Sequence, residues 1–526
     1  MPTAGHLAAD FARDAFMNPV TSFTSRLRTL PAAILLAFAV PATAASPSAW
    51  QRARADPRAA QVAQMTFAER HAFARGYGLG WLPAPNATRS VDNCNDSGPG
   101  SLRAAVAASA SGDVVDASQL ACSKISLTTG AVDIGVDSLT IQGPGPDALT
   151  IGNGSKYDHR VFNHTGTGQL VFADMTITHG TIRTGGADPG STGGCINSAG
   201  SVVLGYGADS TSRRRGVVVS HCMAISTQAD IPAKGGCVYA KSGVTLYGSI
   251  VSGCSALANA GGAALGGGVA TSHAFKAKYS EIRDNVVSGS SARGGGIFAT
   301  NLGGDLVDIS VKYSTIAGNE SSGGAGGIYL SLNVYGLEIR NATISGNRAA
   351  DGVAGAQVIS HVPASGGEIL IKSSTIHGNH SQLGDYGCSV GGVKLAGEAI
   401  QLQSTIVSGN TCDGQPSDLW VASGTATVTG ADNLLGRFEG SVPTAGLIVS
   451  DAPGLAPLVN NGGPTRTHAL LPGSPAIDHG NSSASVTNDQ RGPGFPRVVG
   501  TGVIGATADI GAFEFNPNRI FYSSFE

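Results

Sequence analysis

The middle of the chain alternates apolar and polar positions in short runs, and each run ends at Gly-Asn. Residues 314–319 read STIAGN, and variants of this phrase recur as ATISGN at 342–347, STIHGN at 374–379 and STIVSGN at 404–410. Period-two alternation over so few residues predicts β-strands, and Gly-Asn predicts a tight turn after each one. The apolar anchors recur roughly every 30 residues, a period typical of solenoids. They are Ile250, Ile282, Ile316, Ile344, Ile376 and Ile406.

A second phrase, rich in glycine, lies between the copies of the first. It reads GGGIF at 294–298, GGIY at 326–329 and GGV at 391–393. A helical repeat of this period would need two amphipathic stretches per copy, and the sequence has none. We therefore expect an all-β fold, a single parallel β-helix. With strands about 4.8 Å apart, nine or ten turns would form a rod on the order of 45 Å long.

The ends of the solenoid need cover, because an open first turn would expose its core and strand edges. Ser101 is a candidate N-cap, and Leu102, Ala105 and Val106 would share one helical face. We expect a short capping helix near 101–109. The β-helix should occupy residues 91–430, an irregular C-terminal cap 431–515, and a C-terminal tail 516–526.

The N-terminus has the pattern of a signal peptide over residues 1–44. Arg26 and Arg28 precede an apolar run at 32–40, and the small residues Ala-Thr-Ala at 42–44 suit signal peptidase. Residues 45–90 are expected to be a flexible segment without chemistry. No other run approaches the roughly 20 apolar residues of a spanning helix. These features predict a Sec-exported protein, secreted or at the cell surface, with no transmembrane helix after cleavage.

The composition agrees with stacked strands and argues against a nucleic-acid partner. The chain has 76 glycines, and only 13% of its residues are charged. The formal net charge of -3 provides no bulk attraction to nucleic acid, so we expect no nucleic-acid partner.

The eight cysteines form an even set without a CxxC pair, which favours disulfides over a metal site. We expect Cys94 to pair with Cys122 and Cys388 with Cys412. The remaining four, Cys195, Cys222, Cys237 and Cys254, follow the repeat. They could pair within a turn (195–222 and 237–254) or between turns (195–237 and 222–254), because both arrangements fit the Cα separation of a disulfide.

Motifs at both ends resemble a known group of proteins. The N-terminal motif is CNDSGPGSLRAA at 94–105. The C-terminal motifs are NLLG at 433–436, NGGPT at 461–465, GSPAID at 473–478, DQRG at 489–492 and DIGAFE at 509–514. Together they resemble secreted bacterial right-handed parallel β-helix proteins with a choice-of-anchor Q region. The GGGI and TIxGN phrases are similar to repeats of polymorphic outer-membrane proteins and adhesins. The resemblance implies a right-handed, pectate-lyase-like β-helix outside the cell. It implies no reaction, because such folds include lyases, hydrolases, adhesins and structural rods.

Asparagines recur at one turn of the repeat. Stacked on adjacent strands, their amides can hydrogen-bond to one another, so we interpret them as a structural ladder. The members are Asn285, Asn319, Asn347, Asn379 and Asn410.

Basic residues recur four positions before four successive anchors. They alternate with apolar residues, so they should point outward and stack one per turn. Such a row suits an acidic polysaccharide or a cell-surface glycan; the alternative is an ordinary solvated face, partly neutralised by Asp308, Glu338 and Glu368. The row consists of Lys278, Lys312, Arg340 and Lys372.

No catalytic residue, metal ligand or cofactor is predicted. The nearest candidates are Asp96 with Asp113, Asp305 with Asp308, Asp413 with Asp418, Asp158 with His159, and His377 and His380 with Asp385. Each lies in a turn context, where capping and turn formation are the simpler roles. We therefore expect a non-catalytic, adhesin-like surface protein that binds glycans. The alternatives are a polysaccharide lyase or glycoside hydrolase acting on an acidic polysaccharide, and an inert structural rod.

Overall fold

The structure is a computed structural model. It describes residues 86–517 except 154–157, 185–189, 207–215, 260, 302–306, 333, 362–367, 385–386, 423–425, 482–485 and 500–506, and only the backbone of residues 307, 332, 334 and 335. The described residues all belong to one compact unit, Met65–Glu526. The expected signal peptide and most of the expected flexible segment and tail lie outside the described residues.

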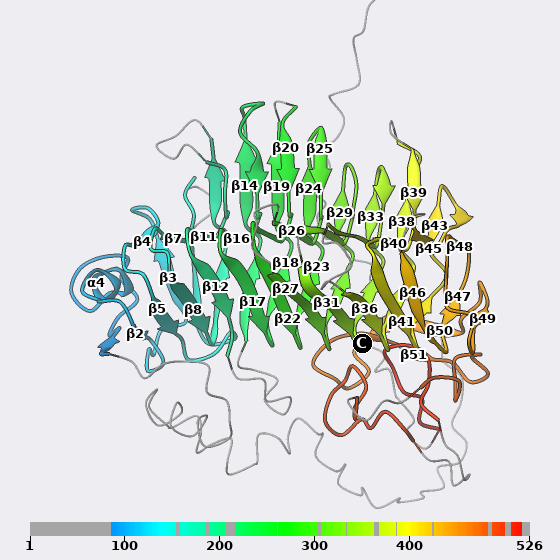
Figure 1. Cartoon of the computed structure of the whole chain (residues 1–526). Coiled ribbons are helices and arrows are strands. Elements are labelled where there is room, and N and C mark those ends of the chain that lie inside the picture. The colour runs from blue at the N-terminus through cyan, green and yellow to red at the C-terminus, as the bar shows by residue number, and fades with distance from the viewer. Residues whose placement is uncertain are drawn as a thin grey trace, which may run out of the picture. The chain divides into compact units, whose positions relative to one another are not determined.

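The chain forms a parallel β-helix, which confirms the predicted fold class (Figure 1). Each complete turn visits four sheets, here named A, B, D and C in chain order. One turn runs through β22 (Ala274–Lys278), β23 (Glu281–Arg283), β24 (Val286–Ser288) and β26 (Ile297–Asn301) before the next begins at β27 (Val307–Lys312). Among the described residues the ladders between turns are parallel, and sheet D ends in an antiparallel pair formed within one turn.

Sheets A and B each hold 12 strands. Sheet A consists of β1 (Thr88–Ser90), β2 (Asp113–Asp116), β5 (Leu139–Gln142), β8 (Gln169–Ala173), β12 (Ser201–Leu204), β17 (Gly243–Tyr247), β22 (Ala274–Lys278), β27 (Val307–Lys312), β31 (Val334–Arg340), β36 (Glu368–Lys372), β41 (Ala399–Gln403) and β46 (Thr427–Ala431). Sheet B consists of β3 (Lys124–Leu127), β6 (Thr150–Asn153), β9 (Met175–Thr178), β13 (Val217–Ser220), β18 (Ile250–Ser252), β23 (Glu281–Arg283), β28 (Thr315–Ala317), β32 (Thr343–Ser345), β37 (Thr375–His377), β42 (Ile406–Val407), β47 (Leu434–Leu435) and β49 (Ile448–Val449).

Sheets C and D complete the turns. Sheet C consists of β4 (Val132–Ile134), β7 (Phe162–His164), β11 (Ile196–Ser198), β16 (Val238–Ala240), β21 (Val269–Thr271), β26 (Ile297–Asn301), β30 (Ile328–Leu332), β35 (Ala356–Ser360), β40 (Val393–Ala396), β45 (Leu419–Val421) and β48 (Phe438–Glu439). Sheet D consists of β10 (Thr181–Arg183), β14 (Met223–Ser226), β19 (Ser255–Ala258), β24 (Val286–Ser288), β29 (Glu320–Ser321), β33 (Arg348–Ala349), β38 (His380–Ser381), β43 (Thr411–Cys412) and β44 (Gln415–Pro416).

Three small sheets extend the four main ones. Sheet E joins β15 (Ala233–Lys234), β20 (Ala263–Leu265) and β25 (Ser291–Arg293), and it lies between sheets D and C along the chain. The two-stranded sheets are β34 (Gly352–Val353) with β39 (Cys388–Val390), and the antiparallel pair β50 (Leu455–Val459) with β51 (Thr467–Leu470).

Inward side chains of consecutive turns stack on one another and form the core. In sheet A, Phe275 of β22 pairs in register with Ile309 of β27, and both are buried. The glycine-rich phrase lets sheet C begin close to sheet D. A Cβ atom at Gly295 would collide with backbone carbonyl oxygens of Gly326 and Glu320, so only glycine fits there.

The register corrects two of the six predicted anchors. Val251, rather than Ile250, pairs with Ile282 in the core, and Ile250 faces outward. In β42, Val407 pairs with Ile376, so Ile406 points away from the main core. The cause is the side-chain period of two in a strand, by which a shift of one residue exchanges the faces.

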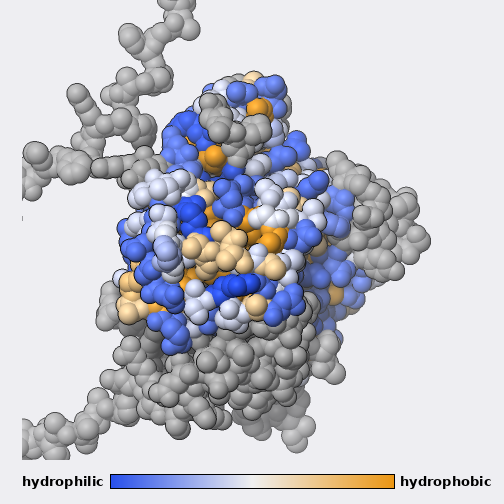
Figure 2. Space-filling view, turned by 90° about the vertical axis from the view of Figure 1, so that its left-hand side faces the viewer, coloured by the Kyte–Doolittle hydropathy of each residue, from blue (hydrophilic) through white to orange (hydrophobic). Residues whose placement is uncertain are grey.

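The predicted N-terminal lid is confirmed as α4 (Leu102–Ala107). The Ser101 hydroxyl oxygen accepts a hydrogen bond from the Ala104 amide, and Leu102, Ala105 and Val106 are buried in the main core. Figure 2 looks onto this end of the β-helix, where hydrophilic residues surround a small apolar area.

The predicted C-terminal cap has two parts with different positions. Val442 and Leu447 pack against the main core, beside the last turn. The chain beyond β49 instead lies along the outer face of sheet B, where Ile406, Leu470 and Phe513 share a separate apolar cluster. Only the first part therefore closes the end of the β-helix, and the second covers its side.

The motifs of the C-terminal region make the polar contacts with sheet B. Gln490 of the DQRG motif hydrogen-bonds through its side chain to Thr343 at 2.6 Å and to Thr315 at 2.9 Å. In the DIGAFE motif, the Ala512 amide donates to the Thr375 hydroxyl at 3.0 Å. His468 contacts the Ser345 hydroxyl at 2.8 Å. The motifs thus hold the segment to threonine and serine side chains that the repeat presents outward.

Buried charges join these motifs to each other. Asp489 accepts hydrogen bonds from the Arg491 guanidinium and from the Glu514 amide. The Glu514 carboxylate in turn accepts from the Asp509 amide at 3.0 Å. Burial, together with repulsion from Asp509, raises the pKa of the Glu514 carboxyl.

The predicted asparagine ladder is present and fully buried. Each amide nitrogen donates to the amide oxygen of the next member at 2.8–2.9 Å, as from Asn347 to Asn379 at 2.9 Å. Asp418 accepts from Asn410 at 2.8 Å and ends the ladder. In earlier turns the same position is taken by cysteine, since the Cys254 amide donates to Asn285 and the Cys222 amide donates to the Cys254 sulfur.

Replacing Asn347 by Leu tests the ladder. The change removes two donated and two accepted hydrogen bonds and leaves buried polar groups unpaired on both neighbouring turns. We expect a loss of about 3 kcal/mol in the free energy of unfolding, measured by chemical denaturation. The matched control is Asn95→Ala at an exposed turn, which should cost little. Equal effects of the two variants would contradict the ladder.

The docking of the C-terminal segment should depend on pH through His468. Burial lowers the pKa of this histidine from 6.5 to about 4, so the folded state holds it neutral. Below pH 6.5 the unfolded chain binds the proton more tightly, and stability is lost as the pH falls towards 4. Relative to His468→Gln, the wild type should lose about 3 kcal/mol over this window in denaturation measurements. The exposed His479→Gln control should follow the wild type, and parallel curves for the wild type and His468→Gln would contradict the mechanism.

Candidate functional site

The four predicted basic residues lie in register on consecutive strands of sheet A. Lys278 pairs with Lys312, Lys312 with Arg340, and Arg340 with Lys372. All four are partly exposed, whereas the preceding residues of their strands, such as Ala277 and Val311, are buried. We call this set the basic row. It lies on β22, β27, β31 and β36, which are neighbouring strands of sheet A (Figure 1).

One carboxylate lies within the basic row. Glu338 of β31 contacts Lys312 Nζ at 2.5 Å and Arg340 Nε at 3.0 Å. A second pair, Lys276 with Asp308, is longer at 3.8 Å and more exposed. The expected neutralisation by Glu338 is therefore present at the centre of the row.

The protonated forms of Lys278 and Lys372, the two ends of the basic row, are destabilised. Burial lowers the pKa of Lys278, and repulsion from Lys312 and Arg340 lowers it further. Burial also lowers the pKa of Lys372, with repulsion from Arg340 as the next cause. Like charges stacked on adjacent strands oppose each other, and an anion bound across them would relieve this repulsion.

Tyrosines beside the basic row were missed by the sequence analysis. Tyr279 and Tyr313 follow Lys278 and Lys312 directly, and their rings stack with centroids 4.9 Å apart. The Lys278 ammonium lies 5.4 Å from the Tyr279 ring centre, and Tyr247 pairs in register with Lys278. The repeated Lys-Tyr dipeptide is the signal that could have revealed them.

Both stacked tyrosines have a left-handed backbone, with φ of 53° at Tyr279 and 52° at Tyr313. The corresponding corners of later turns hold Asn341, Ser373 and Ser404. Short polar residues tolerate this conformation more readily, and a bulky residue there costs of order 1–3 kcal/mol. The two tyrosines therefore occupy strained positions.

The candidate acidic residues serve turns and caps. Burial alone would raise the pKa of the Asp96 carboxyl, but hydrogen bonds from Arg103, Thr128 and Thr129 hold it well below its usual range. Asp113 accepts from Arg89 and from the Ala110 amide.

The remaining acidic candidates that the structure describes also have structural roles. Asp418 ends the asparagine ladder, Asp413 sits in a turn with φ of 48°, and the exposed Asp308 pairs with Lys276. Asp305 and Asp385 lie outside the described residues.

The candidate histidines contact their immediate surroundings. His377 Nδ1 lies 2.7 Å from the Ser408 carbonyl oxygen, and His380 Nδ1 lies 2.7 Å from the Thr411 hydroxyl. His159 Nδ1 contacts the Arg160 carbonyl oxygen, while Asp158 lies 3.8 Å from Arg183. For His377 and His380, the contacts among the described residues include no side-chain carboxylate.

Four disulfides pair all eight cysteines. Cys94–Cys122 and Cys388–Cys412 form as predicted, and of the two open arrangements for the other four cysteines the first is present. Cys195 bonds to Cys222 with a Cα separation of 5.5 Å, and Cys237 bonds to Cys254 with 5.4 Å. The bridges cross from the start of sheet C to the corner before sheet D.

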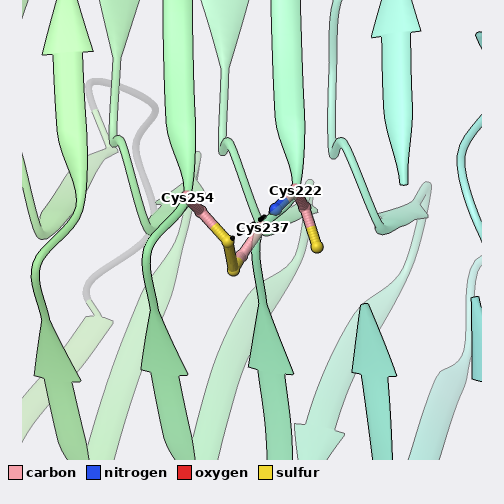
Figure 3. A group of neighbouring side chains, drawn as sticks. All are labelled: Cys222, Cys237 and Cys254. Atoms are coloured by element: carbon pink, nitrogen blue, oxygen red, sulfur yellow. Dashed lines mark hydrogen bonds between the residues drawn. A yellow bond between two sulfur atoms is a disulfide. The ribbon is translucent and has the colours of Figure 1, made fainter. Parts of the chain in front are cut away.

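Three of these sulfur atoms converge. Those of Cys222, Cys237 and Cys254 lie within 4.8 Å of one another. Figure 3 draws the three side chains, with the sulfur atoms of Cys237 and Cys254 bonded. All three belong to disulfides, and metal ligation by cysteine requires a thiolate. The cluster is therefore a stack of two bridges rather than a metal centre.

Comparisons with known proteins give no relative: no family model, curated protein or solved structure matches the chain. Within the described part of the chain, no helix has both the length and the apolar character needed to cross a membrane.

Removing the bridge between Cys237 and Cys254 should destabilise the adjacent turns. The double variant Cys237→Ala, Cys254→Ala should lose about 3 kcal/mol of unfolding free energy, because the bridge restricts the unfolded chain. Peptide mapping of the unreduced wild type should recover Cys195 with Cys222 and Cys237 with Cys254. Recovery of Cys195 joined to Cys237 would contradict the within-turn pairing.

Proposed function

We propose that this protein is an exported, non-catalytic β-helix that binds an acidic polysaccharide or cell-surface glycan along the basic row. The observation that carries the proposal is the register of sheet A, which stacks Lys278, Lys312, Arg340 and Lys372 on consecutive strands. At about 4.8 Å per strand, the four cations span roughly 14 Å. A linear chain with repeated carboxylates or sulfates could contact several of them at once.

The tyrosines beside the row support a sugar ligand. Aromatic rings offer a flat apolar surface with a polar tip, which suits the mixed character of a sugar ring. Tyr279 and Tyr313 hold strained backbone positions that other turns give to short polar residues. A binding role accounts for bulky aromatic residues at a cost in stability, since strain tends to persist where function requires it.

Export is part of the proposal. The pattern of residues 1–44 favours a signal peptide, and four disulfides are compatible with an oxidising compartment. The motifs at 94–105 and 433–514 favour membership of the secreted right-handed β-helix proteins with a choice-of-anchor Q region. The GGGI and TIxGN phrases, which are similar to repeats of adhesins, favour an adhesin-like role.

Binding is preferred over catalysis because of how the candidate carboxylates are used. The carboxylates of Asp96 and Asp418 both accept structural hydrogen bonds, and the Glu338 carboxylate lies between the side chains of Lys312 and Arg340. A glycosidase would instead need two carboxyl groups facing one bond of the substrate.

The double variant Lys312→Glu, Arg340→Glu tests the proposal. It reverses the two central charges, so affinity for polygalacturonate should fall by at least about tenfold, measured by calorimetry at low salt. The control Lys241→Glu changes an exposed lysine before sheet A and should bind like the wild type. Thermal unfolding of each variant would establish that it is folded.

Two outcomes would overturn the proposed function. The first is unchanged binding by the folded double variant. The second is release of new reducing ends or unsaturated sugars by the wild type, which would favour the lyase or hydrolase alternative.

A further inference from the structure

The outer surface of sheet C carries aromatic residues in one register row. Tyr239 of β16 pairs with Ala270 of β21, which pairs with Phe298 of β26 and then Tyr329 of β30. The same row continues through Gln357 of β35, Lys394 of β40 and Trp420 of β45. The alternate positions, such as Ile297 and Ile328, face the main core. We call Tyr239, Phe298, Tyr329 and Trp420 the aromatic row.

A cationic side chain lies over three of the four rings. Lys234 is 5.9 Å from the Tyr239 ring centre, and Lys394 is 3.7 Å from that of Trp420. Arg293 lies 5.1 Å from the Tyr329 ring centre, and its guanidinium donates to the Tyr329 hydroxyl at 3.0 Å.

Sheet E holds two of these cations in place. Lys234 and Arg293 lie at the ends of β15 and β25, whose strands border the aromatic row. Phe298 and Tyr329 stack with centroids 5.3 Å apart and are only 9% and 7% exposed. The rings therefore act as a packed base that orients the cations above them.

These cations differ from the basic row in their neutralisation. Among the described residues, no carboxylate lies within ion-pair distance of Lys234, Arg293 or Lys394, whereas Glu338 contacts two members of the basic row. Glu439, next to Trp420 in register, is the acidic residue at this end. The positive charge of the three cations thus remains available to a ligand.

The row has the length of a polymer site. Six strand steps separate Tyr239 from Trp420, which corresponds to about 29 Å. Gln357, midway between Tyr329 and Lys394, adds a neutral hydrogen-bonding group.

We propose that the aromatic row and its three cations form a second binding track for a linear acidic polysaccharide, separate from the basic row. Lys234, Arg293 and Lys394 would contact carboxylate or sulfate groups, and Tyr239 and Trp420 would flank the sugar rings. The track does not require the basic row, because it lies on a different sheet and uses different residues. A molecule with both sites holds two polysaccharide chains and can cross-link them.

Single-stranded nucleic acid is the competing polyanion. It binds by stacking bases on open ring faces, and here Phe298 and Tyr329 are buried while cations cover the other rings. A polysaccharide needs only the oriented cations and the rims of the rings, so the geometry favours it.

The test compares two variants by calorimetry with a short oligogalacturonate. The sheet C variant is Lys234→Gln, Arg293→Gln, Lys394→Gln, and the sheet A variant is Lys312→Glu, Arg340→Glu. The wild type should bind two ligands, and the sheet C variant should keep one site while the other weakens by at least about tenfold. The matched control Lys124→Gln, Lys241→Gln, Arg348→Gln removes three exposed charges elsewhere and should retain both sites.

Cross-linking provides a second readout. Long polygalacturonate mixed with wild-type protein should form aggregates detectable by light scattering, and the sheet C variant should abolish them without losing binding. The single variant Lys394→Gln, at a partly exposed position, gives an intermediate effect if the triple variant does not fold.

The outcomes separate this proposal from the proposed function. Loss of a site only in the sheet C variant would remove the role of the basic row but keep the second track. Unchanged stoichiometry and affinity in the sheet C variant, or absence of any binding by the wild type, would overturn the second track. Tighter binding of oligo(dT) than of oligogalacturonate would also overturn it.

Discussion

The fold depends on keeping every turn in register with the next. Buried backbone and amide groups cannot reach water, so each must find its partner on the neighbouring turn. The asparagine ladder enforces this at one corner, because Asn347 bonds to both Asn319 and Asn379. Where the ladder is absent, Cys222 and Cys254 take its position and disulfides fix the same corner covalently. The register at this corner is therefore held by amide hydrogen bonds in the later turns and by disulfides in the earlier ones.

This register also creates the surfaces that carry the proposed functions. A side chain that points outward on one turn is followed by its equivalent about 4.8 Å away, so a repeat produces rows of like residues. On sheet A the result is a basic row with internal repulsion, partly offset by Glu338. On sheet C it is a row of rings that orient cations. Rows of this kind match linear ligands better than compact ones.

The C-terminal segment uses the same periodicity as a docking surface. Thr315, Thr343 and Thr375 occupy one outward position on successive strands of sheet B and receive the DQRG and DIGAFE motifs. Sheet B is consequently covered along its later strands, whereas the basic row on the adjacent sheet A stays partly exposed. The segment thereby helps to decide which face of the β-helix can meet a ligand.

The sequence alone determined the parallel β-helix, the capping helix, the ladder and the outward direction of Lys312 and its equivalents, because strand period, turn residues and helix caps are local properties. It could not decide the cysteine pairing, since within-turn and between-turn partners lie at similar distances. It also misplaced Ile250 and Ile406 by one residue, because only pairing across turns fixes which face is inward. Tertiary structure alone placed residues beyond β49 along sheet B and brought Arg293 of sheet E over Tyr329 of sheet C. Those contacts join elements whose separation in sequence carries no periodic signal.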